Sequence, residues 1–180
     1  MPSEDLPPVQ FIRRNDIETK ASQLLRMHGL YAIPVDPVTL ANQYGITVHN
    51  AKFADDNLSG MVARRDEHVS VLVNHSDSTQ RKRFTIAHEL GHHFLHLLED
   101  GEFIDGKIDL FRDSEVDGAE ITDERRREIQ ANQFAASLLM PETLVRSAFE
   151  KIREVSKLAR AFNVSESAMI FRLRDLGLLE

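Results

Sequence analysis

The sequence has no cysteine among its 180 residues. This absence excludes disulfide bonds and thiolate metal ligands, so a transition-metal site would need histidine and carboxylate side chains. The sequence also lacks any apolar run near the roughly 18 residues of a membrane-spanning helix. Residues 1–5, MPSED, are acidic rather than basic and apolar, unlike a secretory signal. We therefore expect a cytoplasmic protein with no membrane association.

Basic residues do not outnumber acidic ones, and the formal net charge is -7. A surface of this sign repels phosphate backbones, so direct nucleic-acid binding is disfavoured. The length suits one compact domain with a small appendage, and an apolar share of 42% is ordinary for a globular protein.

The first half of the chain predicts two helices and three strands. We expect a flexible arm over residues 1–14, and then a helix capped by Asn15 or Asp16 that runs to about Met27. A short helix, Val38–Tyr44, follows Pro37 and ends at Gly45. Strands are predicted around Ile46 and Val48, at Ser59–Arg64 and at His68–Asn74, the last two joined by a hairpin turn at residues 66–67.

The second half is helical. From Ser78, apolar residues follow two stripes of one helix, which is the pattern of a helix buried in the middle of a domain. The acidic stretch Glu99–Gly118 is predicted to be a long loop. Thr122 can cap a second long helix that stops at Pro141, and two short helices should follow, around Thr143–Ala161 and Ser165–Leu176.

These elements predict an α+β fold, mostly helical, with a small three-stranded and mainly antiparallel sheet. We expect a principal domain over residues 15–141 and a C-terminal helical extension over residues 142–180.

The motif His88-Glu89-Leu90-Gly91-His92 matches H-E-x-x-H. Four residues advance about 6 Å along a helix and turn about 40° past a full circle, so both imidazoles share one face. They can therefore hold a zinc ion together, with Glu89 beside the metal as a general base. The alternative is a pair of core histidines bonded to backbone. It fits poorly, because it would bring the Glu89 charge toward the core without a partner.

A third protein ligand would leave one zinc position open for water. Glu128 is our choice, because it extends the buried stripe of the second long helix. Glu124 lies one turn earlier and is the second choice. A carboxylate in the first turn of a helix is already favoured by the positive end of the helix dipole, so it needs no metal to explain it. A buried salt bridge to arginine is the ordinary alternative for Glu128.

Three neighbours of the motif have other expected roles. His96 follows His92 by four residues, and we expect it to pack, because three ligands in a row on one helix fit a tetrahedron badly. His93 should face solvent. Gly91 costs about 1 kcal/mol relative to alanine in a helix, which indicates the close approach of another backbone.

With these residues placed, the chain resembles the ImmA/IrrE family of zinc metallopeptidases. The stretch Arg83–His92, RFTIAHELGH, is similar to the family's first signature, and Glu128–Pro141, EIQANQFAASLLMP, to its second. The third zinc ligand of the family falls on Glu128. The chain departs from the pattern at Gln130, where the family often has a second glutamate.

The resemblance implies a zincin-like, gluzincin-type domain with Zn²⁺ as its cofactor. It implies a cytoplasmic bacterial or phage-borne protease that cleaves a helix-turn-helix repressor and so derepresses a mobile element or a stress regulon. In this hypothesis Ser59–Arg64 or His68–Asn74 is the sheet edge that pairs with an extended substrate. Tyr31, Tyr44, His75 and the arginines remain open as groups that assist zinc at the oxyanion.

Two alternative functions involve no protease activity. Residues 157–173 have the look of a helix-turn-helix, with its turn at Asn163–Ser165 and a basic rim at Arg172 and Arg174. We prefer ordinary packing of two short helices, since the second helix offers few polar side chains to read bases. A non-proteolytic metal-binding regulator, or a toxin–antitoxin component, would keep the metal but not need Glu89.

Overall fold

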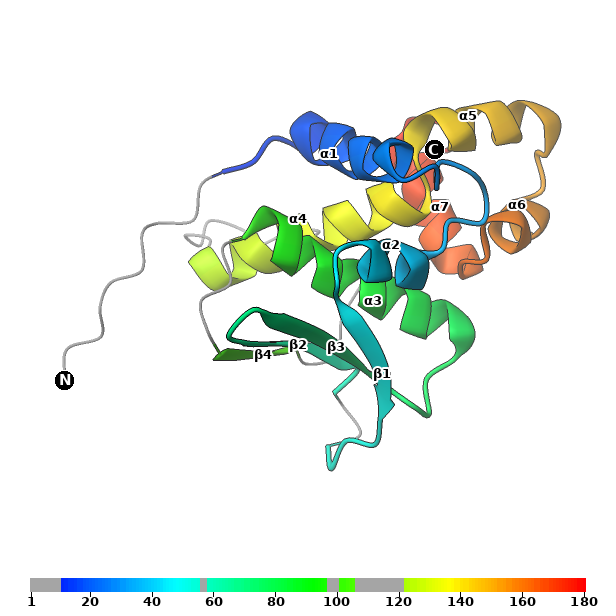
Figure 1. The fold of residues 1–180 in the computed structure, drawn as a ribbon. Coiled ribbons are helices and arrows are strands. Elements are labelled where there is room, and N and C mark those ends of the chain that lie inside the picture. The colour runs from blue at the N-terminus through cyan, green and yellow to red at the C-terminus, as the bar shows by residue number, and fades with distance from the viewer. Residues whose placement is uncertain (1–10, 56–57, 97–100, 106–121) are drawn as a thin grey trace.

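The computed structural model describes residues 11–55, 58–96, 101–105 and 122–180 (Figure 1). Within these residues an α+β fold combines seven helices with four strands. The helices are α1 Arg14–Met27, α2 Pro37–Gln43, α3 Thr79–Leu95, α4 Asp123–Leu139, α5 Glu142–Lys151, α6 Val155–Phe162 and α7 Glu166–Asp175. The strands are β1 Thr47–Ala51, β2 Gly60–Arg65, β3 His68–Asn74 and β4 Gly101–Asp105.

The four strands form one mixed sheet in the order β1-β3-β2-β4. β2 pairs antiparallel with both β3 and β4, and β1 pairs parallel with β3. The predicted hairpin is confirmed, with Asp66 at a φ of 53° in its turn. The prediction that β2 or β3 is a sheet edge is wrong, because both are inner strands and the described sheet ends at β1 and β4.

The fourth strand was not predicted. β4 lies inside the segment Glu99–Gly118, which was expected to be a loop, and its pairing of Gly101 with Arg64 and of Asp105 with Gly60 joins segments about forty residues apart. A strand held by such distant pairing has little local signal in the sequence. The rest of the predicted loop lies outside the described residues.

α3 is the central element of the fold. It packs against β2 and β3 on one side and against α4 on the other, and α1 covers α4 in turn, so the sheet has helices stacked over one face (Figure 1). Ser78 caps α3 by accepting a hydrogen bond from the Arg81 backbone N–H. Since α3 has protein on both sides, its two apolar stripes are both buried, as predicted.

Two helix predictions need correction. α1 begins at Arg14 after an N-cap at Arg13 whose side chain makes no cap bond, so Asn15 and Asp16 lie in the first turn rather than at the cap. The single helix predicted over Thr143–Ala161 is two helices, α5 and α6. The buried side chains Phe149 and Leu158 are nine residues apart, roughly half a turn out of phase in one helix, and the break lets both reach the core.

A buried guanidinium ties the C-terminal helices to the rest of the domain. Arg172 of α7 is only 3% exposed. It donates to the backbone oxygen of Met140 at 2.9 Å and to the Glu18 carboxylate of α1. Glu18 also accepts the backbone N–H of Glu142 at the start of α5. The charge of Arg172 therefore faces inward and does not form the basic rim of the helix-turn-helix alternative, which is consistent with the preferred packing of two short helices.

Among the described helices, none combines the length and the apolar character that crossing a bilayer requires.

Candidate metal centre

α3 carries both histidines of the motif on its buried side. His88 is 0% exposed and His92 7%. Their Nε2 atoms lie 3.0 Å apart, with the rings edge to face. The i, i+4 spacing thus does what helix geometry predicts, and both ring nitrogens converge on one point.

α4 supplies a carboxylate to the same point. Glu128 Oε2 lies 3.3 Å from His88 Nε2, and Glu128 Oε1 lies 3.2 Å from His92 Nε2. These three side chains are a group with metal-ligating atoms within 4.8 Å of one another. The Glu128 side chain is 37% exposed, whereas both histidines are buried. Glu124, the runner-up ligand, is exposed and is not part of the group.

The spacing of the donor atoms fits a tetrahedral metal ion. Nitrogen and oxygen ligands about 2.0–2.1 Å from zinc at tetrahedral angles are about 3.3 Å from one another. The three separations here are 3.0, 3.3 and 3.2 Å. Two imidazoles and one carboxylate are also a ligand set that zinc takes in hydrolases, with the fourth position left for water. The residues present therefore fit the ion.

Asn132 orients one of the histidines. Its Oδ1 lies 2.8 Å from His88 Nδ1, so the ring donates its Nδ1–H to the amide and keeps a lone pair on Nε2 for a metal. Asn132 follows Glu128 by one helical turn, so one face of α4 provides both groups. Asn132 was not among the predicted site residues, although its i+4 spacing from Glu128 is visible in the sequence.

Gly91 lets the two helices come close enough for these contacts. A Cβ placed on Gly91 would lie 3.0 Å from the Cα and 3.1 Å from the backbone oxygen of Ala131. The close approach of another backbone is thus confirmed, and that backbone belongs to α4. Because His88 and His92 flank Gly91 along α3, the contact sets the distance from both rings to Glu128.

Glu89 faces the sheet beside the cluster. It is 0% exposed, and its Oε1 would lie 3.3 Å from a Cβ on Gly60 of β2. A glycine in the strand thus makes room for the buried carboxylate.

The other two histidines at the end of α3 are not part of the ligand group. His96 Nε2 lies 3.3 Å from the backbone oxygen of Arg127, and burial together with the neighbouring His92 lowers the pKa of His96 to about 4. The neutral ring therefore uses Nε2–H as a donor, which agrees with packing. The prediction for His93 is wrong, because this ring is half-buried against Phe94 and desolvation lowers its pKa.

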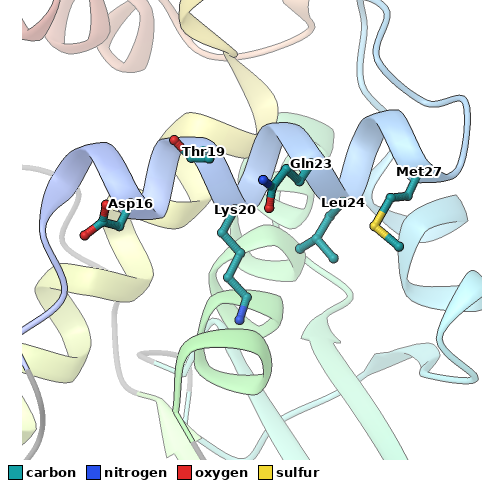
Figure 2. Close-up of a pocket in the computed structure, with 6 residues that line it drawn as sticks. All are labelled: Asp16, Thr19, Lys20, Gln23, Leu24 and Met27. Atoms are coloured by element: carbon teal, nitrogen blue, oxygen red, sulfur yellow. The ribbon is translucent and has the colours of Figure 1, made fainter.

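Three of the groups left open as oxyanion helpers have other surroundings, and the arginines stay open. Tyr31 lies under the Arg26 guanidinium and Tyr44 packs edge to face on Phe94, while His75 is exposed. The surface hollow in Figure 2 is also separate from the cluster, because its lining comes from α1 alone. The lining residues are Asp16, Thr19, Lys20, Gln23, Leu24 and Met27.

Comparison with known proteins gives a consistent set of relatives. The family described as the IrrE N-terminal-like domain matches residues 41–174. The chain is 30% identical over 113 residues to the radiation response metalloprotease IrrE of Deinococcus radiodurans, covering 61% of this chain and 32% of that protein. It is 29% identical over 108 residues to the metallopeptidase ImmA of Bacillus subtilis, covering 59% and 57%.

A solved structure shares the fold. A Mycobacterium tuberculosis transcriptional regulator superposes with a TM-score of 0.67 at 21% identity, covering 88% of this chain and 46% of that one. The chain thus spans about a third to just over half the length of the relatives it matches. The family match covers both α3 and α4 and includes most of the C-terminal helices. This chain belongs to the ImmA/IrrE family of metallopeptidases.

Proposed function

We propose that this protein is a zinc-dependent endopeptidase that makes limited cuts in a protein partner. One observation carries the proposal: His88 and His92 of α3 and Glu128 of α4 converge with tetrahedral spacing while Glu89 is buried beside them. The names of the relatives, metalloprotease IrrE and metallopeptidase ImmA, support the reaction class. We further propose that the protein acts in the cytoplasm.

His88, His92 and Glu128 would hold the ion, and zinc when bound supplies Lewis acidity toward a peptide carbonyl. Asn132 keeps His88 in the tautomer that binds through Nε2. The contact between Gly91 and Ala131 fixes the separation of the two helices that carry the ligands.

Glu89 is the proposed general base. It takes a proton from the attacking water and passes it to the nitrogen of the leaving amine, so one carboxylate serves both halves of the reaction. Glu89 follows His88 directly on α3, but its side chain lies on the face of the helix toward β2. The two histidines lie on the face toward α4. Glu89 thus stands beside the ligand set without belonging to it.

An extended substrate would pair with β4 rather than with β2 or β3. β4 is an outer strand of the described sheet, and its Asp105 pairs with Gly60, the residue beside Glu89. Backbone hydrogen bonds to an outer strand bind a peptide without requiring one particular sequence. This geometry brings a scissile bond to the level of the general base.

The proposed substrate is a helix-turn-helix transcriptional repressor, as the family resemblance implies. Its cleavage would relieve repression of a mobile element or of a stress regulon. The name radiation response metalloprotease links the Deinococcus radiodurans relative to stress.

The test is co-expression of this chain with a repressor encoded beside it, followed by mass spectrometry of the repressor. We expect cleavage by the wild type, no cleavage by Glu89→Gln, and wild-type cleavage by Glu124→Gln, which changes an exposed carboxylate of α4. Cleavage by Glu89→Gln at the wild-type rate would defeat the mechanism.

Comparison of Glu89→Gln with His88→Ala separates the main alternative. A metal-binding regulator or toxin–antitoxin component without protease activity would keep its biological effect in Glu89→Gln and lose it in His88→Ala. The peptidase proposal predicts loss in both.

A further inference from the structure

Thr85 of α3 has a buried hydroxyl that nothing described so far uses. The residue is 0% exposed, and its Oγ1 makes no hydrogen bond to any part of the chain that the structure describes. Leaving a buried polar group without a partner costs about 1–3 kcal/mol. Such a group in a folded protein calls for an explanation.

The hydroxyl lies next to the general base. Thr85 precedes Glu89 by four residues, so the two side chains are neighbours on one face of α3. Both face the same glycine of β2: a Cβ on Gly60 would lie 2.3 Å from Thr85 Cγ2 and 3.3 Å from Glu89 Oε1. Thr85, Glu89 and Gly60 thus form one compact buried group between the helix and the sheet.

Packing alone does not account for a threonine here. Valine has the same shape and no hydroxyl, so it would fill the space without the cost of a buried unpaired donor. The methyl group of Thr85 points at Gly60, and the hydroxyl occupies the other branch of the same Cβ. A threonine in a helix has two accessible χ1 rotamers, and a rotation between them moves the hydroxyl.

We propose that Thr85 is a positioning residue for Glu89, and this inference rests on the proposed peptidase function. After a rotation about χ1 the Thr85 hydroxyl donates a hydrogen bond to the Glu89 carboxylate. An ionised carboxylate only accepts hydrogen bonds, and a hydroxyl is the matching donor. The bond holds the carboxylate in one orientation, with its other oxygen directed at the reacting water.

The first test is a double-mutant cycle on the zinc-saturated full-length chain. It combines Thr85→Val with Glu89→Met and measures urea unfolding, and the zinc affinity of each variant is measured so that its contribution can be subtracted. We expect Thr85→Val to change the unfolding constant about tenfold more in the Glu89 background than in the Glu89→Met background. Equal changes in the two backgrounds would overturn the proposal.

Two further variants separate the hydroxyl from its methyl group. Thr85→Ser keeps the donor and Thr85→Ala removes it, so this pair also serves if Thr85→Val does not fold. We expect the cycle with Glu89→Met to show coupling for Thr85→Ala, as for Thr85→Val, and little or none for Thr85→Ser, which keeps the bond to Glu89. Ile86→Val, a change at the next buried residue, is the packing control and should show no coupling. Serine and alanine variants that behave alike would contradict the inference.

The second test uses the repressor whose cleavage depends on Glu89. Thr85→Val should lower kcat about tenfold with KM unchanged, since a misaligned base affects the chemical step rather than binding. Thr85→Ser should stay within about twofold of the wild type. If Glu89→Gln cleaves normally, the peptidase proposal fails; if Glu89→Gln is inactive but the cycle shows no coupling, only the role of Thr85 fails.

Discussion

The ring Nδ1 of His88 lies 2.8 Å from the side-chain oxygen of Asn132, one helical turn beyond Glu128 on the facing helix. A single face of α4 therefore presents both a candidate ligand and the group that orients another ligand. Outer partners of this kind raise the basicity of a metal-binding imidazole and fix its tautomer.

Replacing Asn132 should weaken zinc binding while preserving the fold. We expect Asn132→Ala to lower zinc affinity about 10–100-fold, because His88 loses the hydrogen bond that directs its Nε2 lone pair. Competition with a chromophoric chelator measures the affinity. Asn132→Asp, which keeps an acceptor, is the matched control and should retain most of it. Equal affinities for wild type and Asn132→Ala would contradict the assigned role.

Removing the carboxylate of Glu128 should cost more zinc affinity than removing any other carboxylate of α4. We expect zinc to raise the melting temperature of the wild type and of Glu124→Gln, and to raise it much less in Glu128→Gln. The reason is that a ligand stabilises the folded state in proportion to the logarithm of its concentration over Kd. Differential scanning fluorimetry with and without zinc makes the comparison. A shift in Glu128→Gln as large as in Glu124→Gln would remove Glu128 from the site.

The substitution Gly91→Ala should destabilise the protein although it favours helix formation. Alanine at an unhindered helix position is about 1 kcal/mol better than glycine. Here its Cβ would lie 3.0 Å from the Cα of Ala131, so α3 and α4 must separate, and we expect a net loss of about 1–3 kcal/mol. Urea unfolding measures the stability. Lys82→Ala in the same helix reports propensity without that contact, and a stabilised Gly91→Ala would contradict the close packing.

The ion pair between Arg172 and Glu18 should contribute strongly to stability. The Arg172 side chain is 2% exposed and that of Glu18 is 18% exposed, so Glu18→Gln leaves a buried positive charge with less compensation. We expect a loss of about 3 kcal/mol in the free energy of unfolding. The control is Lys157→Ala, which removes an exposed partner of Glu154 and should leave the stability unchanged within error. Similar small effects for both variants would show that Arg172 does not hold the helices together.

The elements that the sequence predicted well are those with a local signal. The bounds of β3 are as predicted, the helical pattern expected from Ser78 is α3, and Thr122 caps α4 through its side-chain acceptor as predicted. Helix phase alone placed His88, His92 and Glu128 on faces that the structure brings together. Their roles as ligands, and the division of the chain at residues 14 and 141, remain predictions.

The features that were missed depend on contacts between distant segments. β4 is a strand because it pairs with β2, and this pairing makes β2 an inner strand, while the pairing of β1 with β3 makes β3 an inner strand. An arginine in a short helix is expected at the surface. Arg172 is buried because Glu18 and the Met140 carbonyl, both distant in the sequence, accept its hydrogen bonds. In the sequence nothing distinguishes Asn132 from the other polar residues of α4, because its partner His88 lies on a different helix. Long-range partners of this kind leave no periodic pattern in the sequence.

In the proposed site two imidazoles and one carboxylate hold a zinc ion with one position open to water. X-ray absorption spectroscopy of the zinc-loaded protein measures this ligand set. We expect two imidazole nitrogens and low-Z oxygen ligands at about 2.0–2.2 Å in a four-coordinate site, and the loss of one oxygen ligand in Glu128→Gln. A spectrum with three imidazoles, or one that Glu128→Gln leaves unchanged, would contradict it.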